Sequence, residues 1–220
     1  MLRKVMRRKA AVVALGCAAA SCALGILRPG VGLAGDLDMA AETGVGRAFG
    51  QTGWLLRLFD LPPQPYVLVP VLVLVAANSL AHGRRADALL AASGPALVSI
   101  VNTWALKPSF DRRYGGELSY PSGHAVALAS VLVLLVLLAP PGVARVVVAA
   151  SGTVVFSAAA VGIIGLGYHY LSDIVGAALF ATAAMLSIHL SIAAFLDGNG
   201  RFRRVLGPRA VSTSVRDPSS

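Results

Sequence analysis

Charged side chains are scarce in this sequence of 220 residues: Asp, Glu, Lys and Arg together make up only 13% of it, whereas apolar residues make up 56%. This shortage excludes an ordinary water-soluble domain and indicates an integral membrane protein. Cysteine is almost missing as well, and the two that occur, Cys17 and Cys22, are five residues apart in one apolar stretch. On a helix that spacing points them in different directions, so we interpret both as packing residues rather than a redox or lipid-attachment site.

Long apolar stretches are the main feature of the chain. Six of them carry no charge apart from Asp87 in the third, and most come near the length of about 20 residues that a helix needs to cross a bilayer: residues 10–27, 66–81, 86–106, 125–138, 146–166 and 174–196. We therefore predict an all-α, polytopic membrane protein with six transmembrane helices. A single transmembrane domain is expected over residues 1–207, followed by a disordered cytoplasmic tail over 208–220.

The segment between the first and second stretches, residues 36–65, is too polar to cross the membrane. It contains Trp54, Phe59 and three leucines around Arg57. This mixture of apolar and basic side chains favours a short helix that lies in the outer membrane interface.

The positions of the basic residues predict the orientation. Thirteen of the nineteen lysines and arginines fall on one side of the predicted membrane if the N-terminus is cytoplasmic. The positive-inside rule then makes both termini cytoplasmic. The net charge of +9 is spread over these loops and tails, so it does not indicate a nucleic-acid partner. Abundant Ala, Val, Gly and Arg with only three lysines favours a GC-rich bacterial source, an inner (plasma) membrane and a periplasmic outer side.

Two short histidine segments flank the apolar stretches on the outer side. In the second, His169 and Asp173 are four residues apart, so on a helical turn the carboxylate reaches one ring nitrogen and leaves the other free to attack. In the first, Pro-Ser-Gly-His at 121–124, His124 opens a helix whose free N–H groups attract an anion.

Cations accompany these histidines on the same side. Lys107 ends the third stretch, and either Arg112 or Arg113 can join it in holding a phosphate. A nucleophile, a proton donor and a phosphate-binding group together predict phosphoryl transfer through a phosphohistidine.

These segments resemble the motifs of the type 2 phosphatidic acid phosphatase (PAP2) superfamily. The second family motif is intact at 121–124, the His-x-x-x-Asp ending of the third is present, and the first motif begins at Lys107. The resemblance implies a six-helix bundle and a phosphatase that uses neither a metal nor another cofactor. It also implies the site residues: catalytic His169, His124 and Asp173, and substrate-binding Lys107, Arg112, Arg113, Ser122 and Gly123.

The resemblance also implies a role for each residue. His169 attacks phosphorus, Asp173 orients it, and His124 protonates the leaving oxygen and later activates water. The lysine, an arginine, and the backbone amides of Ser122 and Gly123 bind the phosphoryl oxygens.

Two departures from the family pattern keep a second interpretation open. The first motif has Tyr114 and Gly115 where the family has arginine and proline, and the third has Gly162 and Ile163 where it has serine and arginine. Loss of a phosphate-binding cation predicts lower activity, so the alternative is a catalytically weak or inactive lipid-phosphate-binding membrane protein. Restoring arginine at position 163 discriminates, because a gain in hydrolysis indicates a weakened enzyme.

The outer location of the histidines predicts the kind of substrate. A site level with the headgroups favours a lipid phosphate, such as a polyprenyl diphosphate, a polyprenyl-linked sugar phosphate, phosphatidate or phosphatidylglycerol phosphate. The expected partners are this substrate and membrane lipids. A metal-dependent transferase is disfavoured, because the outer loops lack the clustered carboxylates that hold magnesium.

Overall fold

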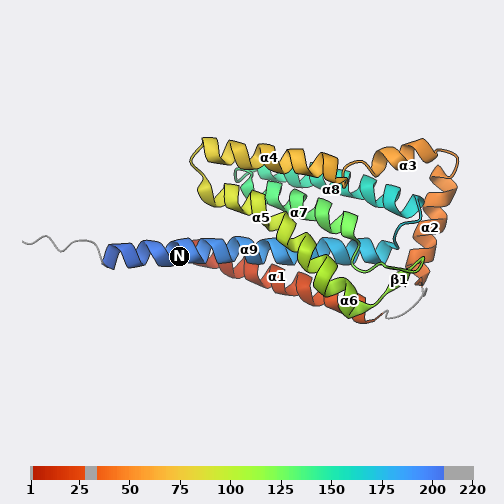
Figure 1. Ribbon diagram of the computed structural model, residues 1–220, viewed down its shortest axis with the longest axis horizontal. Helices are drawn as coiled ribbons and strands as arrows, with labels where there is room; N and C mark the ends of the chain where they lie inside the picture. Colours follow the sequence, from red (N-terminus) through yellow and green to blue (C-terminus); the bar gives the residue numbers. More distant parts are fainter. Residues whose placement is uncertain (1, 28–33, 206–220) are drawn as a thin grey trace, which may run out of the picture.

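The computed structural model describes residues 2–27 and 34–205. Helices account for nearly all of this part of the chain, which confirms the predicted fold class (Figure 1). The long ones are α1 (Leu2–Ile26), α4 (Pro65–Ala81), α5 (Arg85–Val101), α7 (Gly123–Leu138), α8 (Val143–Gly165) and α9 (Leu171–Val205). The tail predicted over 208–220 lies outside the described residues.

Four helical segments are long and apolar enough to cross a membrane: Val5–Ile26, Arg85–Phe110, Val143–Gly165 and Leu171–Leu196. The second of these joins α5 to a π-helical turn, η1 (Asn102–Leu106), and the short helix α6 (Lys107–Phe110). The helices α4 and α7 are apolar but shorter, with 17 and 16 residues. These helices indicate a membrane protein with four candidate spans by length and composition, and the prediction of six spans is not confirmed.

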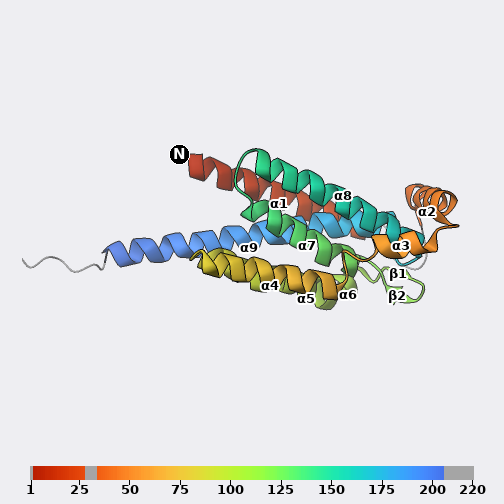
Figure 2. The ribbon, with the colours of Figure 1, turned by 90° about the horizontal axis from the view of Figure 1, so that it is seen from above.

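The helix α7 lies at the centre of the bundle, between α5, α8 and α9 (Figures 1 and 2). Its sequence is apolar on every side, as expected for a helix that neighbours surround. Small residues allow the helices to approach closely, because Ala91 on α5 and Ala177 and Ala181 on α9 are completely buried. Together with larger side chains such as Leu134 and Ile163 they form the main apolar core.

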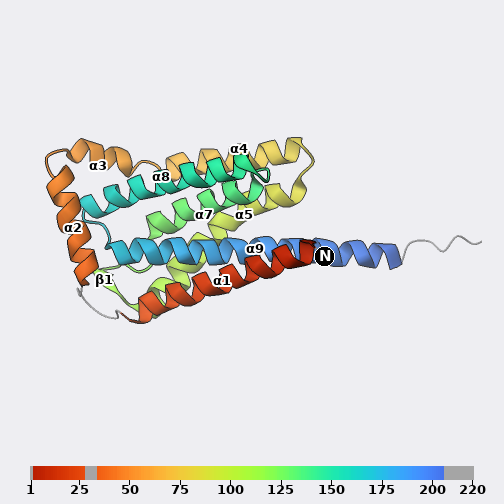
Figure 3. The same ribbon diagram turned by 180° about the vertical axis from the view of Figure 1, so that it is seen from behind.

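The first helix packs along α9 on the outside of this core (Figure 3). Ser21 fixes their register, because its hydroxyl donates to the carbonyl of Gly176 at 3.0 Å. The hydroxyl of Tyr120 in turn donates to the carbonyl of Ser21. These buried hydrogen bonds are strong in an apolar environment and tie α1 to the loop that precedes α7.

The polar segment after α1 forms two helices, α2 (Asp36–Phe49) and α3 (Gly53–Phe59), where one was predicted. Figure 1 shows α2 lying across one end of the bundle, over the ends of α8 and α9, and α3 beside the end of α8. The chain turns twice here because Thr52 and then Pro62 and Pro63 interrupt the helical run.

A two-stranded antiparallel hairpin, β1 (Arg113–Tyr114) and β2 (Glu117–Leu118), follows α6 and was not predicted. Its turn residues Gly115 and Gly116 have φ angles of +58° and +91°. Glycine adopts these angles without strain, whereas proline is held near −65° and cannot. The Gly115 that departs from the family pattern thus permits this tight turn. The hairpin, α2, α3 and the start of α9 all lie at the same end of the bundle (Figure 2).

Candidate active site

Two loops meet at this end of the bundle and bring the histidine segments together. The backbone N–H of Ser122, just before α7, donates to the carbonyl of Asp173 in the first turn of α9 at 3.2 Å. Because α7 and α9 also pack along their length, this bond sets the starts of the two helices side by side.

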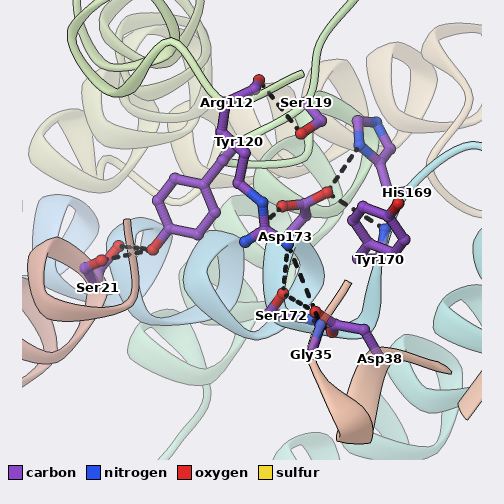
Figure 4. A network of polar contacts seen from close by, with 10 residues as sticks. All are labelled: Ser21, Gly35, Asp38, Arg112, Ser119, Tyr120, His169, Tyr170, Ser172 and Asp173. Atoms are coloured by element: carbon purple, nitrogen blue, oxygen red, sulfur yellow. Dashed lines mark hydrogen bonds and ion pairs between the residues drawn. The ribbon is translucent and has the colours of Figure 1, made fainter. Parts of the chain in front are cut away.

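His169 lies against Asp173, as their spacing predicts. Its Nδ1 atom is 3.6 Å from Oδ2 of Asp173, which is a close charge contact rather than a hydrogen bond. Asp173 is fully buried, and the same Oδ2 accepts a hydrogen bond from the N–H of Tyr170 at 3.2 Å. With Nδ1 facing the carboxylate (Figure 4), Nε2 is the nitrogen that remains for a substrate.

The second oxygen of Asp173 faces Arg112. Nη1 of this arginine is 3.2 Å from Oδ1 of Asp173, and Nη2 is 3.5 Å from Oδ2 of Asp38. Nη2 also donates to the hydroxyl of Ser172 at 2.9 Å, and the guanidinium lies over the rings of Tyr120 and Tyr170. The side chain is only 2% exposed, so this arginine places a buried positive charge next to two buried carboxylates.

Arg113, the neighbouring candidate, lies in a different environment. It is exposed, forms an ion pair with Asp111 at 3.0 Å and donates to the carbonyl of Gly116. The structure therefore brings Arg112 into the histidine cluster and leaves Arg113 on the hairpin surface.

Asp38 of α2 completes the cluster and was not predicted. Its Oδ1 accepts the N–H of Ser172 and its Oδ2 accepts the hydroxyl of Ser172, both at 2.8 Å (Figure 4). Burial alone would raise the pKa of Asp38, but the bonds from Ser172 and Gly35 and the charge of Arg112 outweigh it and hold the pKa below 3.8. This aspartate fastens α2 to the start of α9.

Lys107 approaches the cluster from the end of the third apolar segment. Its side chain is half-buried, and Nζ donates to the carbonyl of Leu118 on the hairpin at 2.7 Å. Its charge interacts with those of Asp173 and Glu117. Because an ammonium group has three donors, two remain for other partners.

His124 begins α7 and faces the same region. Its ring stacks on Tyr168, with centroids 6.4 Å apart and an interplanar angle of 27°. The charges of His169, Lys107 and Asp60 all act on it. The two histidines, the lysine and the buried aspartate thus form one group of the kind that phosphoryl transfer through histidine requires.

Residues 99–196 match the family model of the PAP2 superfamily. This segment is a PAP2 superfamily domain. It contains Lys107, both motif histidines and Asp173, so the family that the motifs predicted is confirmed for this segment, and the family suggests a phosphatase-type activity. Searches of curated proteins and of solved structures found no match to the chain. Helices α1 to α4, and with them Asp38 and Asp60, lie outside the PAP2 segment.

At the start of α7 in the PAP2 segment, Ser122 and Gly123 lie in different surroundings. Ser122 is completely buried, and its hydroxyl caps the helix by accepting the N–H of Ala125 at 3.5 Å. Its own N–H is taken by Asp173, so Ser122 shapes the turn instead of offering the free amide that was predicted. Gly123 is different, because a side-chain carbon added there would meet no atom within 4 Å.

Gly162 and Ile163, which stand where the third family motif has serine and arginine, are both closely packed. A carbon added at Gly162 would lie 2.8 Å from the carbonyl of Leu56 and from the N–H nitrogen of Asp60, so α3 fills the place of a larger residue. Ile163 is 1% exposed and belongs to the apolar core. The departure at these positions therefore coincides with the docking of α3 against α8.

Metal ligands are not clustered at this site. Within the described ranges, 2–27 and 34–205, no three His, Cys, Asp or Glu side chains are grouped so that they could hold a metal ion. The carboxylates that lie closest to the histidines are instead paired with Arg112 or placed in the cavity described below.

Proposed function

We propose that the protein is an integral membrane phosphatase that hydrolyses a phosphate monoester or diphosphate of a lipid at the outer membrane face, without a metal or another cofactor. The observation that carries this proposal is the contact of His169 with the buried Asp173, 3.6 Å apart, in the same cluster as His124. Covalent catalysis by histidine needs this arrangement of an oriented nucleophile and a separate proton donor.

In the first step, Nε2 of His169 attacks phosphorus. A bond forms between nitrogen and phosphorus, and the bond from phosphorus to the ester oxygen breaks. His124 donates its proton to that departing oxygen. The charge of Asp173 stabilises the imidazolium that forms on His169, and Arg112 holds Asp173 in place.

In the second step, water replaces the leaving group. His124, now neutral, takes a proton from the water as its oxygen attacks phosphorus. The bond between phosphorus and Nε2 breaks, phosphate leaves, and both histidines return to their starting states. One residue thus acts first as acid and then as base.

In this proposal, two groups bind the phosphoryl oxygens. The first is Lys107, which keeps two donors beyond its bond to Leu118. The second is the backbone N–H of Gly123, which opens α7 and has free space around it. We assign Arg112 to orienting Asp173, and leave Arg113 outside the site because it pairs with Asp111.

An apolar groove next to His124 supports a lipid substrate. It has a volume of about 240 Å³, and Pro65, Leu68 and Leu72 of α4 face Pro95 of α5 and Ala127 of α7 across it. Ala127 is three residues after His124, so it lies one turn below it on the same face of α7. A hydrocarbon chain in this groove would place its phosphate at the level of the histidines.

The bundle supports the orientation proposed for it. With α4 and α7 counted, six helices cross, and the two shorter ones need their flanking residues or a locally thinner bilayer. The N-terminal end of α1 lies at the opposite end of the bundle from α2, α3 and the hairpin (Figure 1). Cytoplasmic termini therefore correspond to an active site on the outer, periplasmic side of a bacterial inner membrane.

The direct test is phosphate release by the purified protein from lipid monophosphates and diphosphates in EDTA. We expect release by the wild type and none by His169→Ala. His82→Ala is the matched control, because His82 is exposed at the far end of α4 and should change nothing. Absence of release from every lipid by the folded wild type would rule out the proposed activity.

A second candidate is a lipid-phosphate-binding protein of weak or no activity, which the buried Ile163 favours. It predicts that the wild type binds a lipid phosphate but releases no phosphate. In Ile163→Arg, a gain in hydrolysis would indicate a weakened enzyme. Because position 163 lies in the apolar core, Ile163→Met serves as the control for packing.

A further inference from the structure

A second, polar cavity lies beside His124. It has a volume of about 380 Å³, within the range of small-molecule sites. It is formed by the end of α3, the turn into α4 and the loop between α8 and α9. Its polar lining consists of Arg57, Asp60, Gln64, Tyr66 and Tyr168.

This cavity adjoins the proton donor rather than the nucleophile. Tyr168 lines it and stacks on the ring of His124 at 6.4 Å. Asp60, on the cavity wall, is close enough for its charge to act on His124. In the proposed reaction His124 protonates the leaving oxygen, so a group in this cavity is the part of the substrate that departs.

Asp60 points to what this group must contain. The residue is only 8% exposed; its Oδ2 accepts the side-chain amide of Gln64 at 2.8 Å, while its Oδ1 has no hydrogen-bond partner among the residues described. Burial raises the pKa of this carboxyl group, against the opposing charge of His124. A buried oxygen that accepts no hydrogen bond costs free energy, and a hydroxyl group of a ligand would supply the missing donor.

The remaining lining selects against two other classes of leaving group. A hydrocarbon alcohol would remove water from an arginine, an amide and a carboxylate, and its chain would offer them no hydrogen bonds to replace that water. A leaving phosphate, as in a lipid diphosphate, could pair with Arg57, but it would bring a second negative charge against Asp60 and has no donor for the free oxygen of that carboxylate. A carboxylate, an amide and two tyrosine rings instead offer the acceptors, donors and flat surfaces that a hydroxylated carbon skeleton requires.

We propose that this cavity binds the part of the leaving group next to the oxygen that departs, and that this part is a polyol or sugar unit which donates a hydroxyl hydrogen bond to Asp60. The proposal rests on the proposed phosphatase function and narrows it. The substrate is then a lipid-linked phosphate monoester of a hydroxylated carbon chain or ring, rather than a lipid diphosphate.

The test compares two lipids that differ by one hydroxyl: phosphatidylglycerol phosphate and its analogue without the central hydroxyl of the terminal glycerol. Both are presented in detergent micelles with EDTA. We expect the wild type to favour the hydroxylated lipid in kcat/KM by about tenfold or more, the size of a hydrogen bond to a charged acceptor. Asp60→Asn should reduce this ratio toward one, whereas Asp111→Asn, an exposed carboxylate at the same end, should leave it unchanged.

Each outcome bears on one of the two proposals. Equal kcat/KM for both lipids in the wild type would overturn the polyol site while the phosphatase function stood. So would hydrolysis of phosphatidate alone, or an unchanged ratio in Asp60→Asn. Release from no lipid phosphate would remove the phosphatase function itself. If Asp60→Asn does not fold, the wild-type ratio and Tyr66→Phe, which removes one hydroxyl from the cavity wall, decide the question.

Discussion

The two histidines of this protein lie in opposite kinds of surroundings. His169 faces a network of buried charges in which Arg112 forms ion pairs with both Asp173 and Asp38, each at most 2% exposed. His124 faces a cavity in which one oxygen of the buried Asp60 has no partner among the described residues. The first environment holds a side chain in one position, and the second leaves room for a ligand.

This difference corresponds to the two tasks of the proposed reaction. A nucleophile benefits from a fixed orientation, because small displacements from the line of attack are costly. The leaving group varies from substrate to substrate, so the residues around it determine which substrate is accepted. The PAP2 segment supplies the histidines, and helices α2 and α3, which lie outside it, supply the carboxylates that make the two sides differ.

The largest effect is expected from the histidines themselves. His169→Ala removes the nucleophile and should lower phosphate release by more than about 10⁴-fold, whereas His124→Ala should lower it by about 10²- to 10⁴-fold. With p-nitrophenyl phosphate, whose leaving group needs no proton, His124→Ala should recover the first step, seen as a burst of p-nitrophenol, but not the water step that His124 also assists, and His169→Ala should recover neither. Equal recovery of both variants would contradict the assignment of the two roles.

Substitutions in the buried network beside His169 should lower the stability of the protein more than substitutions of exposed charges nearby. Arg112→Ala removes a buried positive charge that lies next to Asp38 and Asp173 and should cost about 3–5 kcal/mol in the free energy of unfolding. Arg113→Ala removes an exposed ion pair next to it and should change that energy by less than about 0.5 kcal/mol. Denaturant unfolding in detergent measures both. Similar losses would mean that burial of the network contributes little.

The packing of α3, which carries Asp60, can be disturbed at one position. Gly162→Ala brings a methyl group within 2.8 Å of the backbone of Leu56 and Asp60 and should destabilise by about 1–3 kcal/mol. Gly152→Ala is the control, because its nearest neighbour would be Leu132 at 3.5 Å, an ordinary contact. A stable Gly162→Ala variant would show that α3 moves freely against α8.

The smallest effect is a dependence of stability on acid pH. The pKa of Asp38 lies below 3.8 in the folded protein, so the folded state binds fewer protons than the unfolded state as pH falls. The contribution of Asp38 is therefore complete above pH 3.8 and is lost as pH falls through its folded pKa. Melting temperatures measured below pH 5 should decline less steeply in Asp38→Asn than in the wild type. A steeper decline would reverse this sign.

Much of the catalytic group could be predicted from the sequence because its members are near one another along the chain. His169 and Asp173 lie one helical turn apart, and Ser122 and His124 stand at a helix start, so local geometry determines their relation. Asp38 is 134 residues from its partner Ser172, and no spacing or periodicity connects them. Asp60 and Tyr168 were missed for the same reason, since each became relevant only through a neighbour from another helix.

By itself the sequence determined that this chain enters a membrane, because long apolar stretches satisfy their backbone hydrogen bonds in lipid only as helices. It also determined the family, through short motifs whose residues act together over a single turn. The tertiary structure decided which arginine is buried between carboxylates and which is exposed, and it placed near His124 an aspartate with one oxygen that has no hydrogen-bond partner among the described residues. These outcomes depend on how α2 and α3 pack against the ends of α8 and α9, and long-range packing leaves no local pattern in the sequence.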